Sequence, residues 1–146
     1  MYDARSVTQD FLDRQGEATI SGDLEGTLAF CDLPCTLESL EGRTVARTEA
    51  EMRAICQAFI DSLRSRQLTH MMRRALEADF KDGQTIWATY ETRYIRAGKL
   101  LTDDPYVSFI ILKRVAERWK ISMLQLTASG DSPANATLRQ WTPDAD

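Results

Sequence analysis

Hydrophobic and polar residues alternate with a helical period at the start of the chain. Val7 and Phe11 fall on one side of a predicted helix over residues 6–21. Asp23 is a good N-cap for a second, shorter helix, which ends before Pro34 because a residue preceding proline is disfavoured in the helical region. The N-terminal pattern therefore predicts two short amphipathic helices.

A strand pair and a third helix follow. Residues 35–39 and 43–47 are the predicted strands, joined by a turn. Thr48 and Glu51 have the spacing of a capping box, which marks the start of a helix. The apolar residues of this helix form one stripe: Met52, Ile55, Phe59, Ile60 and Leu63.

From His70 the period changes to two, which is typical of half-buried strands. Four long strands are predicted, up to residue 127. In the first, we assign the even-numbered side chains to the buried face: His70, Met72, Arg74, Leu76, Ala78 and Phe80. In the second, the same face carries Ile86, Ala88, Tyr90, Thr92 and Tyr94.

The order of these elements predicts an α+β fold. Long consecutive strands with helices gathered in the N-terminal half suit a curved antiparallel sheet packed on three helices, in the shape of a cone. We expect a single domain over residues 1–130. Residues 131–146 are rich in small and polar residues and are predicted to be a loosely ordered tail, with Trp141 as its one possible tether.

Composition excludes several classes of function. The chain has 146 residues, a net charge of −4 and 43% hydrophobic residues. We therefore expect one soluble domain, and we do not expect nucleic acid as a partner. No leader or membrane span is apparent, and a cytoplasmic location is expected. With three cysteines and one histidine, we predict no metal site and no cofactor; Cys31, Cys35 and Cys56 are interpreted as buried thiols.

Three short motifs carry a family resemblance: residues 21–26 (SGDLEG), residues 36–39 (TLES) and residues 118–123 (RWKISM). In their order and spacing they resemble the nuclear transport factor 2-like superfamily, which includes ketosteroid isomerase, scytalone dehydratase and the SnoaL-like polyketide cyclases. The resemblance implies a cystatin-like cone with an interior pocket. It implies little about activity, because this fold hosts many unrelated functions.

The resemblance to ketosteroid isomerase also implies which side chains reach the pocket. That family's oxyanion-donating tyrosine falls at Gln15, its carboxylate base at Ser39 and its protonated aspartic acid at or near Ile111. None of the three groups is present, so steroid isomerase activity is not expected. The same comparison places Phe109 and Ile111 inside the cone.

Candidate site residues follow from these faces. His70 and Tyr90 are the predicted catalytic acid/base and hydroxyl groups, and Arg74 is the predicted anchor for an anion. The alternatives are a hydrogen-bonded histidine at a strand end and an arginine in a salt bridge with an unidentified acid. The full set of predicted ligand contacts is Gln15, Phe59, Met72, Arg74, Thr92, Tyr94 and Phe109.

The sequence therefore predicts a pocket protein for a small, largely apolar organic molecule, with or without cofactor-free acid/base chemistry of the isomerase, cyclase or dehydratase type. The alternative is a non-catalytic dimerisation or ligand-carrier module. A homodimer is predicted through the convex face of the sheet. That face is expected to carry Trp87, Glu91, Arg93, Ile110, Leu112, Trp119, Ile121 and Met123.

Overall fold

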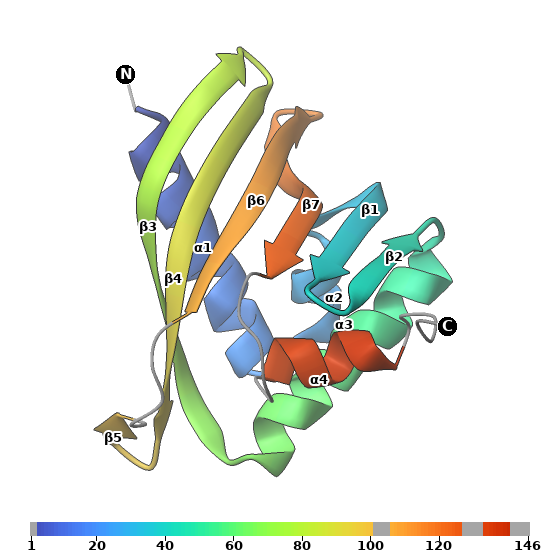
Figure 1. The fold of residues 1–146 in the computed structure, drawn as a ribbon, viewed down its shortest axis with the longest axis vertical. Helices are drawn as coiled ribbons and strands as arrows, with labels where there is room; N and C mark the ends of the chain where they lie inside the picture. Colours follow the sequence, from blue (N-terminus) through green and yellow to red (C-terminus); the bar gives the residue numbers. More distant parts are fainter. Residues whose placement is uncertain (1–2, 101–105, 127–132, 141–146) are drawn as a thin grey trace.

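A curved sheet wraps around the helices of the protein (Figure 1). The computed structural model describes residues 3–100, 106–126 and 133–140. The helices are α1 (Ala4–Ile20), α2 (Leu24–Leu28), α3 (Glu49–Ser65) and α4 (Pro133–Arg139). The strands are β1 (Cys31–Ser39), β2 (Gly42–Ala46), β3 (Leu68–Asp82), β4 (Thr85–Arg96), β5 (Lys99–Leu100), β6 (Tyr106–Val115) and β7 (Arg118–Leu126). The predicted α+β class is confirmed.

The strand order across the sheet is β2-β1-β7-β6-β4-β3, and β5 pairs with β4. Neighbouring strands are antiparallel except β1 and β7, which are parallel. The sheet is therefore antiparallel, as predicted, except where β1 joins β7.

Short polar side chains set the starts of the helices. Asp23 Oδ1 accepts the Gly26 amide at 2.9 Å, and Thr48 Oγ1 accepts the Glu51 amide at 3.2 Å, so both predicted caps are confirmed. The first helix begins at Ala4, earlier than the predicted residue 6, because Asp3 caps it.

The C-terminal segment contains a helix that the sequence did not predict. Helix α4 packs against α3 and β1, and its Leu138 is buried. The predicted loose tail is therefore wrong for Pro133–Arg139, where burial of one apolar side chain offsets a weak local propensity. Trp141, the predicted tether, lies outside the described residues.

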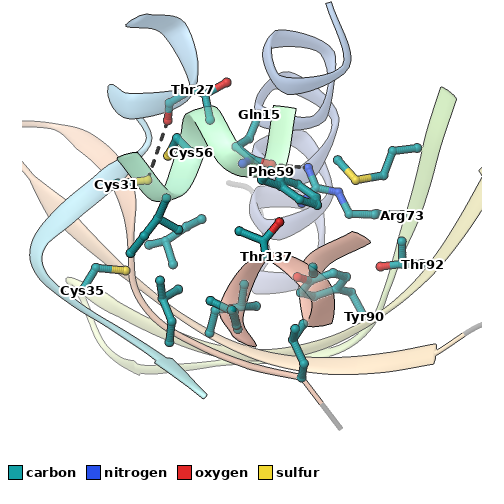
Figure 2. Close-up of a pocket in the computed structure, with 18 of the residues that line it drawn as sticks. Gln15, Thr27, Cys31, Cys35, Cys56, Phe59, Arg73, Tyr90, Thr92 and Thr137 are labelled. Carbon is teal, nitrogen blue, oxygen red and sulfur yellow. Dashed lines mark hydrogen bonds between the residues drawn. The ribbon is translucent and has the colours of Figure 1, made fainter. Parts of the chain in front are cut away.

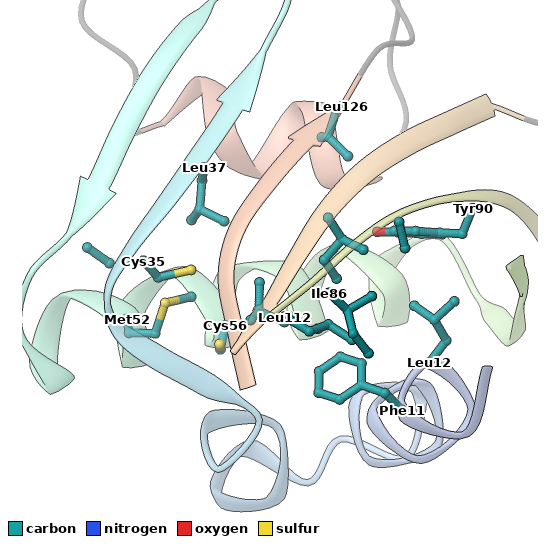
Figure 3. Packing of buried hydrophobic residues seen from close by; sticks show 14 of the residues in the cluster. Phe11, Leu12, Cys35, Leu37, Met52, Cys56, Ile86, Tyr90, Leu112 and Leu126 are labelled. Carbon is teal, nitrogen blue, oxygen red and sulfur yellow. The ribbon is translucent and has the colours of Figure 1, made fainter. Parts of the chain in front are cut away.

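The core lies between the concave face of the sheet and the helices. Figure 3 shows Phe11 and Leu12 of α1 facing Ile86 of β4 and Leu112 of β6. Ile86, Ile110 and Leu112 are completely buried. The concave face of the sheet therefore carries the largest share of the buried apolar side chains.

Strand β4 has the predicted faces, with its even-numbered side chains from Ile86 to Tyr94 buried. Strand β3 does not. Its pairing with β4 shifts register between Leu68 and His70 and again between Ala75 and Glu77. Each shift is a β-bulge, whose extra residue reverses the alternation of side chains. The prediction is wrong for His70, Met72 and Arg74, because between the two bulges the odd-numbered residues face inward.

The amide of Gln9, on α1, joins the helix to the edge of β3 at the second bulge. Its Nε2 donates to the Arg73 carbonyl at 2.9 Å, and its Oε1 accepts the Ala75 amide at 2.8 Å. Backbone groups of an edge strand that lack a strand partner are thereby satisfied by a side chain. Helix α1 thus holds the backbone on both sides of Arg74.

The predicted faces of β6 and β7 also need correction. Cross-strand partners share a face, and Ile110 pairs with Ala88 while Ile111 pairs with Trp87. Ile110 and Leu112 are therefore inside, and Phe109 and Ile111 are outside. On β7, Ile121 is buried and Trp119 packs against the core, so of the apolar residues predicted for the convex face only Trp87 and Met123 remain there.

Candidate ligand-binding site

A cavity of about 100 Å³ lies inside the cone, between the concave face of the sheet and helices α1, α3 and α4 (Figure 2). An engineered cavity of about 150 Å³ holds benzene, so this one, at about two-thirds of that volume, has room for a smaller organic group. Its described apolar lining residues are Leu37, Met52, Ile55, Phe59, Met71, Ile121, Leu124, Leu126, Ala134 and Leu138.

Arg73 is the charged group of this cavity. It comes from β3, and its Nη2 donates to the Leu12 carbonyl at 2.6 Å and to Gln15 Oε1, both on α1. Figure 2 shows the Gln15 amide meeting the guanidinium next to Phe59. Gly16 makes the approach possible, because a Cβ at this position would lie 2.9 Å from Nη2.

The charge of Arg73 has no carboxylate partner within 4.0 Å among the described residues. A guanidinium has five N–H donors, and the hydrogen bonds to Leu12 and Gln15 both come from Nη2. Its Nε is buried without a hydrogen-bond partner. The ring of Tyr90, 5.8 Å from the guanidinium carbon, gives a cation–π contact. The site thus holds a cation whose hydrogen-bonding capacity is incompletely used.

Hydroxyl groups from neighbouring strands lie beside this cation. Thr92 of β4 pairs with Arg73 on one side and with Tyr106 of β6 on the other. Tyr94 and Tyr106 share a hydrogen bond of 2.6 Å between their hydroxyl oxygens. The row gives the cavity a polar side opposite its apolar lining.

The tyrosines are held in the neutral form. Burial raises the pKa of Tyr106 to about 12 and that of Tyr94 well above its ordinary value. Burial also raises the pKa of Tyr90, against the opposing effect of the Arg73 charge. All three are hydroxyl donors at neutral pH, suited to a carbonyl or carboxylate oxygen.

Five of the residues predicted for the site line the cavity: Gln15, Phe59, Tyr90, Thr92 and Tyr94. The other four do not. Phe109 is on the convex face, where its ring contacts Trp87 with centroids 5.7 Å apart. Arg74 is exposed, and its Nε donates to Glu91 Oε1 at 3.0 Å, so the acid left unidentified in the sequence is Glu91.

His70 and Met72 are exposed and lie in a surface groove between α1 and β3. His70 Nδ1 is 3.1 Å from Thr69 Oγ1, which is the strand-end arrangement proposed as the alternative to a catalytic role. The groove shares Met71 and Arg73 with the cavity. The structure therefore places the imidazole outside the cavity.

Sequence reasoning missed Arg73, Tyr106, the residues of α4 and the three cysteines, all of which line the cavity. For Arg73, the alternation of side chains in an ideal strand predicted the outer face of the sheet. For Cys31, Cys35 and Cys56 no spacing rule brings together two strand residues and one helix residue. Only the packing of β1 against α3 does so.

Arg73 is the one charged side chain among the described residues that line the cavity. Within the described ranges, no group of three or more His, Cys, Asp or Glu side chains is arranged to hold a metal ion. None of the described helices is long and apolar enough to cross a membrane.

Comparison with known proteins decides the family. A family model described as "NTF2-like protein (DUF6841)" matches residues 4–129. The chain belongs to this NTF2-like family. Helix α4 lies beyond the matched residues, although its side chains line the cavity. Among curated proteins none matches the chain.

Solved structures with the same fold include an NTF-2 like protein of unknown function from Shewanella oneidensis MR-1, with 17% identity and a TM-score of 0.63 over 82% of this chain and 94% of that chain. A domain of unknown function with a cystatin-like fold from Nostoc punctiforme has 18% identity and a TM-score of 0.66, covering 92% and 83%. An NTF2-like protein from Novosphingobium aromaticivorans has 19% identity and a TM-score of 0.62, covering 92% and 88%. These identities show a common fold.

Proposed function

We propose that this NTF2-like protein binds a small organic molecule with an apolar body and an anionic group, such as a carboxylate. The observation that carries the proposal is Arg73: a cation at the cavity with no carboxylate within reach in the described residues and with a buried, unpaired Nε. An isolated buried charge is unfavourable, so a bound anion would gain a charge-assisted interaction that the protein itself leaves unmade.

The rest of the cavity supports the same class of ligand. Its apolar lining would contact a hydrocarbon body, and the hydroxyl groups of Tyr90 and Thr92 lie beside the guanidinium to orient a second oxygen. The described lining contains no carboxylate and no imidazole, which are the usual acid/base groups of isomerases and dehydratases. The proposal is therefore for binding.

Benzoate and its neutral analogue benzamide are suitable probes, since they share an apolar ring and differ in charge. Calorimetric titration into the wild type should show saturable binding of benzoate and weaker binding of benzamide. In Arg73→Met, benzoate affinity should fall by about tenfold to a hundredfold, the effect of losing a charge-assisted hydrogen bond of about 1.5–3 kcal/mol.

Arg74→Met is the matched control, because it removes the neighbouring charge from the opposite face and should leave benzoate affinity unchanged. Gly16→Ala keeps Arg73 but displaces its guanidinium. It should lower the affinity for benzoate by a smaller factor than Arg73→Met does. Equal losses in the two arginine variants, or binding of benzoate that does not depend on Arg73, would contradict the proposal.

We also propose that a second copy of the chain covers the convex face, as the sequence predicted, although with a partly different set of residues. Met72 is 52% exposed, Trp87 45% and Val107 39%, and all three lie on this face. Such exposed apolar area favours association with an identical face. Analytical ultracentrifugation should show a dimer that Trp87→Glu dissociates; a wild type that stays monomeric at every concentration tested would refute it.

A further inference from the structure

Three free thiols gather at the end of the cavity away from Arg73. Figure 2 shows Cys31, Cys35 and Cys56 on one side of the cavity and Arg73 on the other. Cys31 and Cys35 come from β1, and Cys56 comes from α3. Since the described residues form no cluster suited to a metal ion, the chemistry open to these thiols is that of sulfur itself.

Cys31 and Cys56 both line the cavity, and Figure 2 shows them as neighbours in its wall. The interaction between the two thiols lowers the pKa of Cys31 and raises that of Cys56. Cys31 in turn lies 3.7 Å from the carbonyl oxygen of Thr27. The charge of Lys120 lowers the pKa of Cys31 further, against the effect of burial. For Cys35, burial raises the pKa.

Access distinguishes Cys31 from the other two thiols. Cys35 and Cys56 are buried, but Cys31 is only half-buried. It also lines a second hollow, a surface groove of about 310 Å³ shared with Leu33, Met52 and Lys120. A small polar oxidant in this groove would therefore meet Cys31 first, because Cys56 does not line the groove.

We propose that Cys31 is an oxidation site for peroxides and that Cys56 resolves it, giving a Cys31–Cys56 disulfide that links β1 to α3 in the cavity wall. The Cys31 thiolate attacks one peroxide oxygen, the O–O bond breaks, and the leaving hydroxide takes a proton to become water. Cys56 sulfur then attacks the sulfenic acid, releasing a second water. Two thiols are oxidised and one peroxide is reduced by two electrons.

The test uses the full chain, reduced, freed of reductant and treated with hydrogen peroxide. Intact mass should fall by two hydrogen atoms, and peptide mapping should find Cys31 joined to Cys56. Cys35→Ser should react as the wild type does. Cys56→Ser should stop at a Cys31 sulfenic acid that dimedone traps, and Cys31→Ser should form no disulfide. These readouts need no ligand, so they are independent of the proposed binding function.

The role of the groove has its own matched pair of variants. Lys120→Met should slow oxidation of Cys31 severalfold, whereas Lys113→Met, which removes the lysine paired with it across β6 and β7, should not. A disulfide that includes Cys35, equal oxidation of all three thiols, or a disulfide that forms only after unfolding in urea would overturn the proposal.

Discussion

Arg73 and Arg74 are neighbours in the chain, and the structure gives them opposite environments. Arg74 is on the convex face, exposed, and paired with Glu91 across the strands. Arg73 is at the cavity, held by Leu12 and Gln15, with no acid in reach among the described residues. The comparison separates a charge that is paired on the surface of the sheet from one that lies at the cavity without an acidic partner among the described residues.

The same contrast extends along the two faces of the sheet. The concave face includes completely buried side chains such as Ile86, Ile110 and Leu112, while the convex face keeps apolar side chains partly exposed. Stability should therefore depend on the first face, and association on the second. Mutations matched across the two faces test this division.

The largest effect is expected for Ile110→Ala compared with Ile111→Ala. Ile110 is completely buried on the concave face, so its truncation should lower the free energy of unfolding by about 2–5 kcal/mol. Ile111, its neighbour on the convex face, is partly exposed, and its truncation should cost well under half as much. Urea unfolding of both variants measures the difference; equal losses would refute the assignment of the faces.

A smaller effect is expected at alkaline pH, from the tyrosines of the concave face. Tyr106 keeps its proton in the folded protein up to a pKa of about 12, against an ordinary value of 10.0. Between these values the unfolded chain binds fewer protons than the folded one, so the free energy of unfolding should fall as pH rises, by a total of the order of 2 kcal/mol. Below pH 10 this contribution is fully present.

Tyr106→Phe separates this contribution from that of the lysines, which titrate in the same range. The variant should show a flatter decline in the free energy of unfolding above pH 10 than the wild type does. Parallel pH profiles for the two proteins would show that Tyr106 is not held in its neutral form by the fold.

The smallest effect on stability is expected for the arginines themselves. Arg74→Met removes an exposed ion pair and should change the free energy of unfolding by less than about 0.5 kcal/mol. Arg73→Met removes an unpaired charge from the cavity and should leave stability unchanged or raise it by about 1 kcal/mol. A large loss in Arg73→Met, measured by urea unfolding, would make Arg73 a structural residue.

Much of the fold is legible in the amino-acid sequence alone. The helix caps at Asp23 and Thr48, the faces of β4 and the α+β order all follow from interactions within a few residues, and each was predicted. The motifs at residues 21–26, 36–39 and 118–123 also sufficed to predict the NTF2-like family. Local physical chemistry and element order determine these features.

Only the tertiary structure decided the candidate site. Two bulges in β3, held against α1 by Gln9, reverse the alternation of side chains and bring Arg73 to the cavity instead of Arg74. A bulge depends on how one strand pairs with another and has no period of its own in the sequence. The meeting of Cys31 with Cys56 and the docking of α4 likewise arise from contacts between distant segments, which no local pattern specifies.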